Sequence, residues 1–309
     1  MSTPQAGILA AVPNLSRYLE FSSVPDTDLA AVVGSLASRK LAEDVVIGIG
    51  PSLVQGLKGS IELLRTFPSL SGPGCEVPST QADIWCWIRG DDRGEIAHTG
   101  RSIAHQLQPA FRCSRLVDGF SYDGGRDLSG YEDGTENPEG ELAFAAAITE
   151  GAGAGLDGPS FVAVQQWVHD LDHFEGLAQD DRDNIIGRRR SDNEELDDAP
   201  ISVHVKRTAQ ESFDPEAFVV RRSMPWADAG GEGLMFAAFG ESLDPFEAQL
   251  KCVTGQEDGV VDGLFRFTRP VSGSYFWCPP ALDGALDFSA LGMERPIVPS
   301  PGISVRTIQ

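Results

Sequence analysis

The sequence predicts an α+β fold, in which helices cover one face of an antiparallel sheet and this arrangement is built twice. Three observations predict it. The chain has 309 residues, a length that suits two domains of roughly 150 residues each. Strand-like and helical runs mix in both halves without a regular β-α-β alternation. The order strand, short polar link, helix occurs at residues 82–107 and again at residues 233–253.

Runs rich in β-branched and aromatic residues mark the expected strands of the two halves. These runs are Asp44–Gly50, Ala82–Arg89, Ser160–Val168, Ile201–Lys206, Phe218–Arg222 and Gly233–Phe239. Apolar residues spaced three and four apart mark the expected helices between the strands. These helices are Asp28–Leu41, Gly100–Gln108 and Pro245–Val253.

The boundary between the two domains is expected within Gly151–Pro159, because the sequence GAGAGLDGP is rich in glycine and suits a flexible linker. This places one domain at residues 1–150 and the other at residues 151–309. A second segment, Arg188–Pro200, carries dense charge and predicts an exposed loop.

The chain is strongly acidic, with 46 acidic against 24 basic residues and a formal net charge of −22. Such a charge is repelled by nucleic acid and by anionic membrane surfaces, so we expect neither as a partner. The hydrophobic share of 41% is ordinary for a globular protein with a sizeable core. An enzyme with small substrates fits this composition, although an acidic excess alone is typical of a solvated surface.

The cysteines argue against a disulfide framework and against a zinc site built on thiolates. Their number is odd, and none forms a C-x-x-C pair; they are Cys75, Cys86, Cys113, Cys252 and Cys278. The segment Met1–Glu20 lacks a basic region followed by a long apolar run. Nothing in the chain approaches the roughly 18 consecutive apolar residues of a membrane span, so we expect a cytoplasmic protein.

The most unusual segment is Gly130–Pro138, with the sequence GYEDGTENP. Its Asp-Gly and Asn-Pro pairs favour a turn. Asp133 lies between Gly130 and Gly134, so the backbone can come close to a flat ligand. A carboxylate that folding buries beside apolar strands would have a raised pKa, as catalytic acids and bases often do. A plain turn and a functional acid are both open at this point.

This segment resembles the G-x-x-D-G signature of dye-decolourising peroxidases, commonly extended to G-F-x-D-G-T-x-N-P. Tyr131 stands where the family usually has Phe, and the matching residues are Gly130, Asp133, Gly134, Thr135, Asn137 and Pro138. The resemblance implies a haem peroxidase in which Asp133 acts on hydrogen peroxide. It also implies that Gly134 and Thr135 lie at the haem.

The same resemblance implies an iron-binding histidine downstream, followed by an arginine. His204, within SVHVKR, holds the family position and follows Asp133 by 71 residues. Arg221 follows after 17 more, within VVRRSMPW, which resembles the family's R-x-S-x-P stretch. Because side chains alternate along a strand, Arg222 is expected to point away from the side that Arg221 faces. Ser223 is implied as a supporting residue beside Arg221.

Four further residues are implied by shorter matches. Asp262, in VDGLFRFTRPVSGSYFWCPP, matches an acidic residue that accepts the second N–H of the ligand histidine. Leu234 and Phe236, in GLMFAAF, match the strand that walls the distal side of the haem. Arg188, in DNIIGRRR, matches an arginine that pairs with a haem propionate.

For the whole chain, the resemblance implies two ferredoxin-like domains with one haem b in the C-terminal one. Hydrogen peroxide and small aromatic reductants are the implied substrates, with a ferryl species as the oxidant. A homodimer or larger oligomer is expected. An encapsulating shell stays undecided, because the tail Pro299–Gln309 contains no convincing cargo peptide.

In the implied mechanism Asp133 moves the peroxide proton, Arg221 stabilises the charge of the breaking O–O bond, and Asp262 increases the basicity of His204. A carboxylate base works down to low pH, so we expect an acidic optimum. Aromatic residues with a polar tip could carry electrons between the haem and bulky donors, and these are Tyr131, Trp226, Tyr275 and Trp277.

Two other functions remain open from the sequence. A haem-binding protein that releases iron or handles haem would keep the cofactor and lose the peroxide chemistry. A haem-free interaction module is the second alternative, since a fold alone does not fix a function. A zinc or non-haem iron site is disfavoured, because His169 and His173 lack an evident third ligand.

Overall fold

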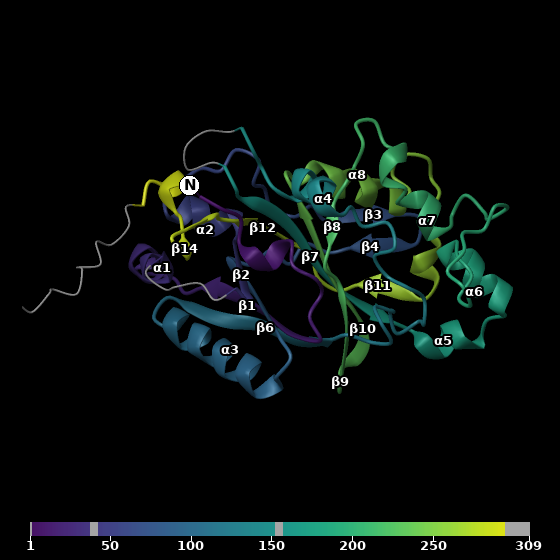
Figure 1. Cartoon of the computed structure of the whole chain (residues 1–309), viewed down its shortest axis with the longest axis horizontal. Coiled ribbons are helices and arrows are strands. Elements are labelled where there is room, and N and C mark those ends of the chain that lie inside the picture. Colours follow the sequence, from purple (N-terminus) through teal and green to yellow (C-terminus); the bar gives the residue numbers. More distant parts are fainter. Residues whose placement is uncertain (1, 38–42, 152–156, 294–309) are drawn as a thin grey trace, which may run out of the picture.

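The computed structural model describes residues 2–37, 43–151 and 157–293. Its first half contains strands and helices, of which α1 and α3 lie at the same end of the molecule in Figure 1. The elements are η1 (Ala6–Ile8), β1 (Leu15–Ser23), α1 (Leu29–Ala37), β2 (Val45–Ile49), α2 (Pro51–Gly56), β3 (Leu70–Gly72), β4 (Cys75–Val77), β5 (Ile84–Gly90), α3 (Arg93–Leu107), β6 (Phe111–Phe120) and α4 (Gly140–Ala147).

The second half adds a further set of strands and a group of short helices, α5 to α7, at the opposite end of the molecule (Figure 1). The elements are β7 (Ser160–His169), α5 (Leu171–Gly176), α6 (Gln179–Ile186), α7 (His204–Arg207), η2 (Gln210–Ser212), β8 (Val220–Arg221), β9 (Met224–Asp228), β10 (Gly231–Gly240), α8 (Asp244–Val253), η3 (Gly263–Arg266), β11 (Thr268–Pro270), β12 (Ser274–Cys278), β13 (Ala281–Leu282), β14 (Ala285–Leu286) and η4 (Ser289–Leu291).

The same strand arrangement occurs in each half. In the first half β6, β1, β5 and β2 lie side by side, with α1 between β1 and β2 and α3 between β5 and β6 along the chain. In the second half β12, β7, β10 and β9 repeat this order, with α8 between β10 and β12. This is the β-α-β-β-α-β pattern of ferredoxin-like domains. The α+β prediction is therefore confirmed, and so is its duplication.

The two halves join into one antiparallel sheet of ten strands in the order β11-β7-β12-β2-β5-β1-β6-β9-β10-β8, in which β7 also pairs with β10. The sheet thus closes on itself. Each seam between the halves is narrow, with one residue pair at Trp277 and Ile49 and another at Gly119 and Trp226. A division at residue 150 stays a prediction, because residues 152–156 of the expected linker lie outside the described residues.

The closed sheet separates two apolar cores, because side chains on a strand alternate between its faces. From β5, Trp85 and Trp87 point into the interior of the closed sheet, where their rings stack with Tyr18. The alternating residues Ile84 and Ile88 point outward, into the core that includes residues of α1, α3 and α8. A strand buried on both faces is apolar throughout, which is why this segment was readable from sequence.

One predicted strand is wrong. Ile201–Lys206 contains a turn and the start of α7, whose first residue is His204. The β-branched residues Val203 and Val205 pack against Gly187, where a Cβ atom would lie 3.1 and 3.2 Å from them. These two valines are therefore apolar because they pack against a loop, and not because they lie in a strand.

Other predicted elements are confirmed with changed ends. Phe218–Arg222 contains only the two-residue strand β8, and the helix predicted from Gly100 begins earlier, after Asp92, whose carboxylate accepts from the Glu95 N–H at 2.9 Å. The helix predicted at Asp28–Leu41 contains α1, and residues 38–41 lie outside the described residues, as does Pro299–Gln309. No disulfide joins the five cysteines, all of which lie within the described residues. No helix among the described residues has the length and apolar character to cross a membrane.

Candidate active site

A cavity lies between residues 127–133 and the second half of the chain, with a volume of about 1010 Å³ that includes space open to solvent. Most of its lining is apolar and comes from β7, β10, α8 and the segment around η3. Among these residues are Trp167, Leu234, Phe236, Phe246, Leu250, Leu264, Phe265 and Phe267. Polar and charged side chains make up the smaller part of the lining surface, and they include Asp133, His204, Arg221 and Asp262. Side chains 129 residues apart in sequence therefore meet at one site.

His204 is held by a buried carboxylate. Its Nδ1 lies 2.8 Å from Oδ2 of Asp262, which is 2% exposed. The other oxygen of Asp262 accepts from the Leu264 N–H at 2.8 Å and caps η3. Because a carboxylate accepts, Nδ1 carries the hydrogen and Nε2 keeps its lone pair. This is the tautomer that a metal-binding imidazole needs.

Asp133 lies in a loop that two glycines shape. Gly130 and Gly134 have φ angles of +85° and +79°, which favour glycine. Protein surrounds the Asp133 carboxylate, yet its side chain is accessible from the cavity. Burial raises the pKa of Asp133 above its ordinary value, while the positive charge of Arg221 opposes that increase. The result is an acid that can gain or lose a proton at a cavity wall.

Arg221 is positioned through its backbone by the same loop. Asn137 accepts from the Arg221 N–H at 2.8 Å and donates from Nδ2 to the Arg221 carbonyl at 3.0 Å. The Nε of Arg221 is buried and has no hydrogen-bond partner among the described residues. A buried donor without a partner is rare in proteins and suits a ligand that the site receives. Arg222 turns to the other side of the strand and donates to the Leu9 carbonyl at 3.1 Å.

Asp133 and Arg221 also line a second, more polar cavity, with a volume of about 610 Å³ that likewise includes space open to solvent. Gly134 and Ser223 line it as well, and the Ser223 Oγ is buried without a partner among the described residues. The acid and the guanidinium thus lie between two hollows of different character.

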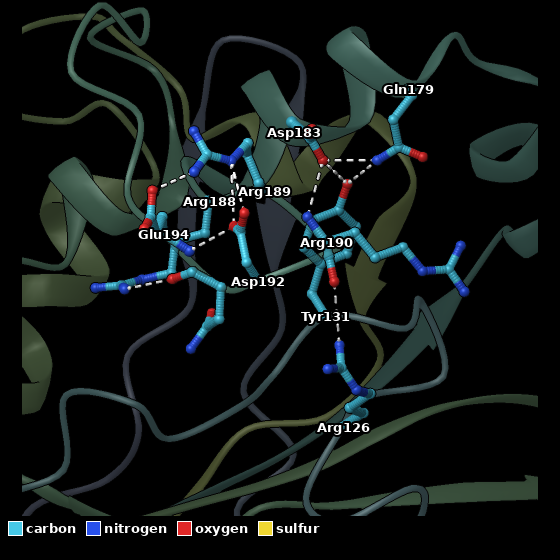
Figure 2. Close-up of polar contacts among 10 residues, drawn as sticks. Arg126, Tyr131, Gln179, Asp183, Arg188, Arg189, Arg190, Asp192 and Glu194 are labelled. Carbon is cyan, nitrogen blue, oxygen red and sulfur yellow. Dashed lines mark hydrogen bonds and ion pairs between the residues drawn. The ribbon is translucent and has the colours of Figure 1, made fainter.

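Two of the predicted residues are not in the lining of either cavity. Arg188 forms ion pairs with Glu136 at 2.5 Å and Glu195 at 3.3 Å, in the charged loop that Figure 2 draws in part. Thr135 is exposed and accepts from Asn193 Nδ2 at 3.0 Å. Both therefore serve contacts within the loop region in this structure.

His169 also lines the cavity, although it was not predicted as a site residue from the sequence. Its Nε2 lies 3.0 Å from Oδ2 of Asp127, and its Nδ1 lies 2.6 Å from the Thr268 hydroxyl. Burial would raise the pKa of Asp127, but the hydrogen bond and charge of His169 outweigh it and lower that pKa. The alternation of side chains along a strand could have indicated it. Gln165, Trp167 and His169 share one face of β7, and all three line the cavity.

His173, which the sequence paired with His169, is exposed in α5 and does not line the cavity. Among the described residues no three His, Cys, Asp or Glu side chains are grouped to bind a metal ion. A single histidine with a free lone pair in an apolar cavity fits a cofactor that brings the other iron ligands itself, as haem does.

Comparison with known proteins points the same way. The model of the C-terminal region of Dyp-type peroxidases matches residues 124–283, which include Asp133, His204, Arg221 and Asp262. A dye-decolorizing peroxidase of Rhodococcus erythropolis is 30% identical over 282 residues, which cover 89% of this chain and 78% of that protein.

Solved structures share the fold. DyPB from Rhodococcus jostii RHA1 superposes with a TM-score of 0.80 and 26% identity, over 90% of this chain and 96% of that one. Its variants have been solved in complex with haem. The dye-decolorizing protein from V. cholerae gives a TM-score of 0.80 and 26% identity, over 89% of this chain and 96% of that one.

Proposed function

Because this chain belongs to the Dyp-type peroxidase family, we propose that it reduces hydrogen peroxide at a haem in the larger cavity and oxidises aromatic or dye-like donors. The observation that supports this most is the meeting of four groups in one cavity. An imidazole with a free lone pair, the carboxylate that orients it, a second carboxylate and an unpartnered guanidinium line the same space.

The cofactor in this proposal is one haem b, which supplies redox chemistry at its iron when it is bound. His204 would bind the iron through Nε2, and Asp262 would hold the ring by accepting from Nδ1. A carboxylate partner increases the basicity of a ligand imidazole. The apolar side chains Leu234 and Phe236 would contact the porphyrin and exclude water.

Asp133 is the proposed acid–base group. It takes the proton from one peroxide oxygen and gives it to the other oxygen, which leaves as water. A single positioned group can perform both transfers. No histidine among the described residues lines the second cavity, where Asp133 and Arg221 lie together. The Asp133 carboxylate is therefore the group in this cavity that we propose for transfer of the peroxide proton.

Arg221 is proposed to stabilise the negative charge that develops as the O–O bond breaks. A guanidinium stays charged throughout the working pH range, and its buried Nε has no competing partner among the described residues. Ser223 is proposed to help as a hydroxyl donor beside it. The more polar second cavity gives peroxide a route to this pair that avoids the apolar wall.

The test is a visible spectrum of the protein from haem-supplemented cells, before and after one equivalent of hydrogen peroxide. We expect a Soret band that shifts on addition of peroxide. His204→Ala should bind haem poorly, whereas His173→Ala, an exposed histidine of the same half, should bind it normally. A protein that takes up no haem would contradict the proposal. Loss of iron with intact porphyrin released would favour the haem-handling alternative.

Oligomeric assembly and a cytoplasmic location stay predictions from the sequence. Arg188 remains the proposed partner of a haem propionate, a role in which it would have to exchange its contacts with Glu136 and Glu195.

A further inference from the structure

We propose that Tyr131 is the residue through which donors too large for the cavity deliver electrons, with Asp183 as its proton acceptor. The proposal rests on the proposed peroxidase function. It concerns how electrons enter the site, which the pair Asp133 and Arg221 leaves open.

The contacts of Tyr131 carry the inference. Tyr131 lines the larger cavity, and its hydroxyl donates a hydrogen bond to Oδ1 of Asp183 at 2.5 Å. Figure 2 shows the Asp183 carboxylate where three donors converge. The other two are the Gln179 Nε2 at 2.7 Å and the Arg190 N–H at 3.3 Å. Tyr131 therefore borders the cavity as a residue, and its hydroxyl contacts a fixed carboxylate.

The other tyrosines of the chain lack this combination. The chain has four tyrosines, and all four lie within the described residues. The hydroxyls of Tyr18 and Tyr275 are buried with no hydrogen-bond partner among those residues, so their protons would have no acceptor. Tyr122 is 42% exposed. It lines the smaller cavity and does not line the larger one. Among the four tyrosines, Tyr131 alone both lines the larger cavity and donates its hydroxyl hydrogen to a carboxylate.

Tyr131 also reaches toward the surface. Gln179, the exposed first residue of α6, donates to the Tyr131 hydroxyl at 3.2 Å. The tyrosine itself is only 4% exposed, so this glutamine and its helix cover the hydroxyl. A donor that rests on α6 would lie close to the phenol without entering the cavity.

The chemistry balances in two steps. In the first, Tyr131 would lose one electron to the haem that His204 would hold, with peroxide as the oxidant, and its hydroxyl proton would pass to Asp183, which would leave a neutral phenoxyl radical and a carboxylic acid. The donor then gives one electron to the radical, and the proton returns from Asp183 to the oxygen. The donor is oxidised by one electron and the site is reduced by one. Peroxide is the source of the oxidising equivalents.

The resting state suits this sequence. Burial raises the pKa of Tyr131, and the hydrogen bond to Asp183 raises it further, so the phenol keeps its proton until an electron leaves. Oxidation makes a phenol strongly acidic, and the carboxylate is already at hydrogen-bond distance.

The test uses the haem-loaded protein carrying ring-deuterated tyrosine, frozen after mixing with hydrogen peroxide and read by electron paramagnetic resonance. We expect a radical signal that deuteration narrows and that Tyr131→Phe removes. Phe is the residue the family usually has at this position, so the variant should fold and bind haem. Tyr275→Phe is the matched control and should leave the signal unchanged.

Asp183→Asn tests the proton acceptor. Asparagine still accepts a hydrogen bond but does not take the proton, so radical formation should slow by about 10²–10⁴-fold. In steady state, Tyr131→Phe should reduce the turnover of bulky dyes more than it reduces the turnover of small phenols.

A signal that persists in Tyr131→Phe would overturn the proposal. So would narrowing by deuterated tryptophan in place of deuterated tyrosine, which would assign the radical to one of the five tryptophans, of which Trp167 lines the cavity. In either case a Soret shift with peroxide in every variant would leave the peroxidase function standing. Absence of haem would overturn both.

Discussion

Asn137 holds the backbone of Arg221 by two hydrogen bonds, at 2.8 and 3.0 Å, and so takes the place of a neighbouring strand at the edge of β8. The loop that supplies Asp133 therefore also positions the arginine. A side-chain amide can do this because it offers one donor and one acceptor in a plane, as a peptide unit does.

This contact predicts the effect of Asn137→Ala. The variant leaves the N–H and carbonyl of Arg221 without their partner, which should cost about 1–3 kcal/mol per unsatisfied group if water does not replace it. We expect haem binding to persist and the reaction with peroxide to slow. Stopped-flow spectra at the Soret band measure that rate. A rate equal to that of the unaltered chain would show that the contact with Asn137 does not determine the position of the Arg221 guanidinium.

Arg221→Ala should slow the peroxide reaction by about 10²–10³-fold, as loss of an oxyanion donor does in other enzymes. Arg221→Lys should recover only part of the rate, because an ammonium lacks the planar fork of donors. Arg93→Ala is a control for loss of one positive charge, since Arg93 is exposed in α3, outside both cavities. Equal rates for Arg221→Ala and the control would refute the role.

Asp133→Asn separates activity from stability. The raised pKa of Asp133 means that the folded state favours the protonated form. The stability this group contributes is present below its unfolded pKa and is lost as the pH rises through its folded pKa. At neutral pH the carboxylate thus costs stability, and Asp133→Asn should raise the melting temperature while slowing the peroxide reaction. A lower melting temperature at pH 7 would contradict this reasoning.

The same carboxylate should set the acid limb of the pH–rate profile. The base must be ionised, so the rate of the peroxide reaction should fall as the pH drops through the raised pKa of Asp133. We expect the optimum on the acidic side of neutrality. In Asp133→Asn this limb should disappear. A profile that peaks above neutrality, or a limb that survives in the variant, would point to another base.

Asp262→Asn tests the support of His204. The amide holds the ring less strongly and donates less electron density through Nδ1, so the imidazole becomes less basic. We expect the reduction potential of the bound iron to rise, as measured by spectroelectrochemistry. Asp258→Asn is a nearby control, because Asp258 pairs with Arg207 and does not line the cavity. An unchanged potential in Asp262→Asn would leave Asp262 a structural residue only.

Much of this architecture was readable from sequence, and the exceptions have physical reasons. Strands buried on both faces, such as β5 and β7, have continuous apolar runs that identify them. The strand β6 was not predicted because four of its residues are exposed, and charged or polar residues interrupt its apolar pattern. The helix α7, which begins at His204, was not predicted because the valines on both sides of His204 are typical of a strand.

The site was predicted where a residue sits in a dense motif, and missed where it does not. Asp133 and Arg221 come from compact stretches that leave few alternatives. His169 stands at the end of a strand with no motif around it, and its partners Asp127 and Thr268 are distant in sequence. The alternation along β7 could place His169 on the same face as Gln165 and Trp167, but it could not show these partners, which come close only after the chain has folded.

The closure of the sheet has a consequence for the behaviour of the chain in a crowded solution. Because β7 pairs with β10, the strands that end the sheet order are β11, with three residues, and β8, with two. Short edges offer few free N–H and C=O groups to another molecule, which is how natural sheets avoid edge-to-edge aggregation. Asn137 occupies part of the β8 edge as well. The residue that orients Arg221 therefore also hides backbone groups that could otherwise recruit a foreign strand.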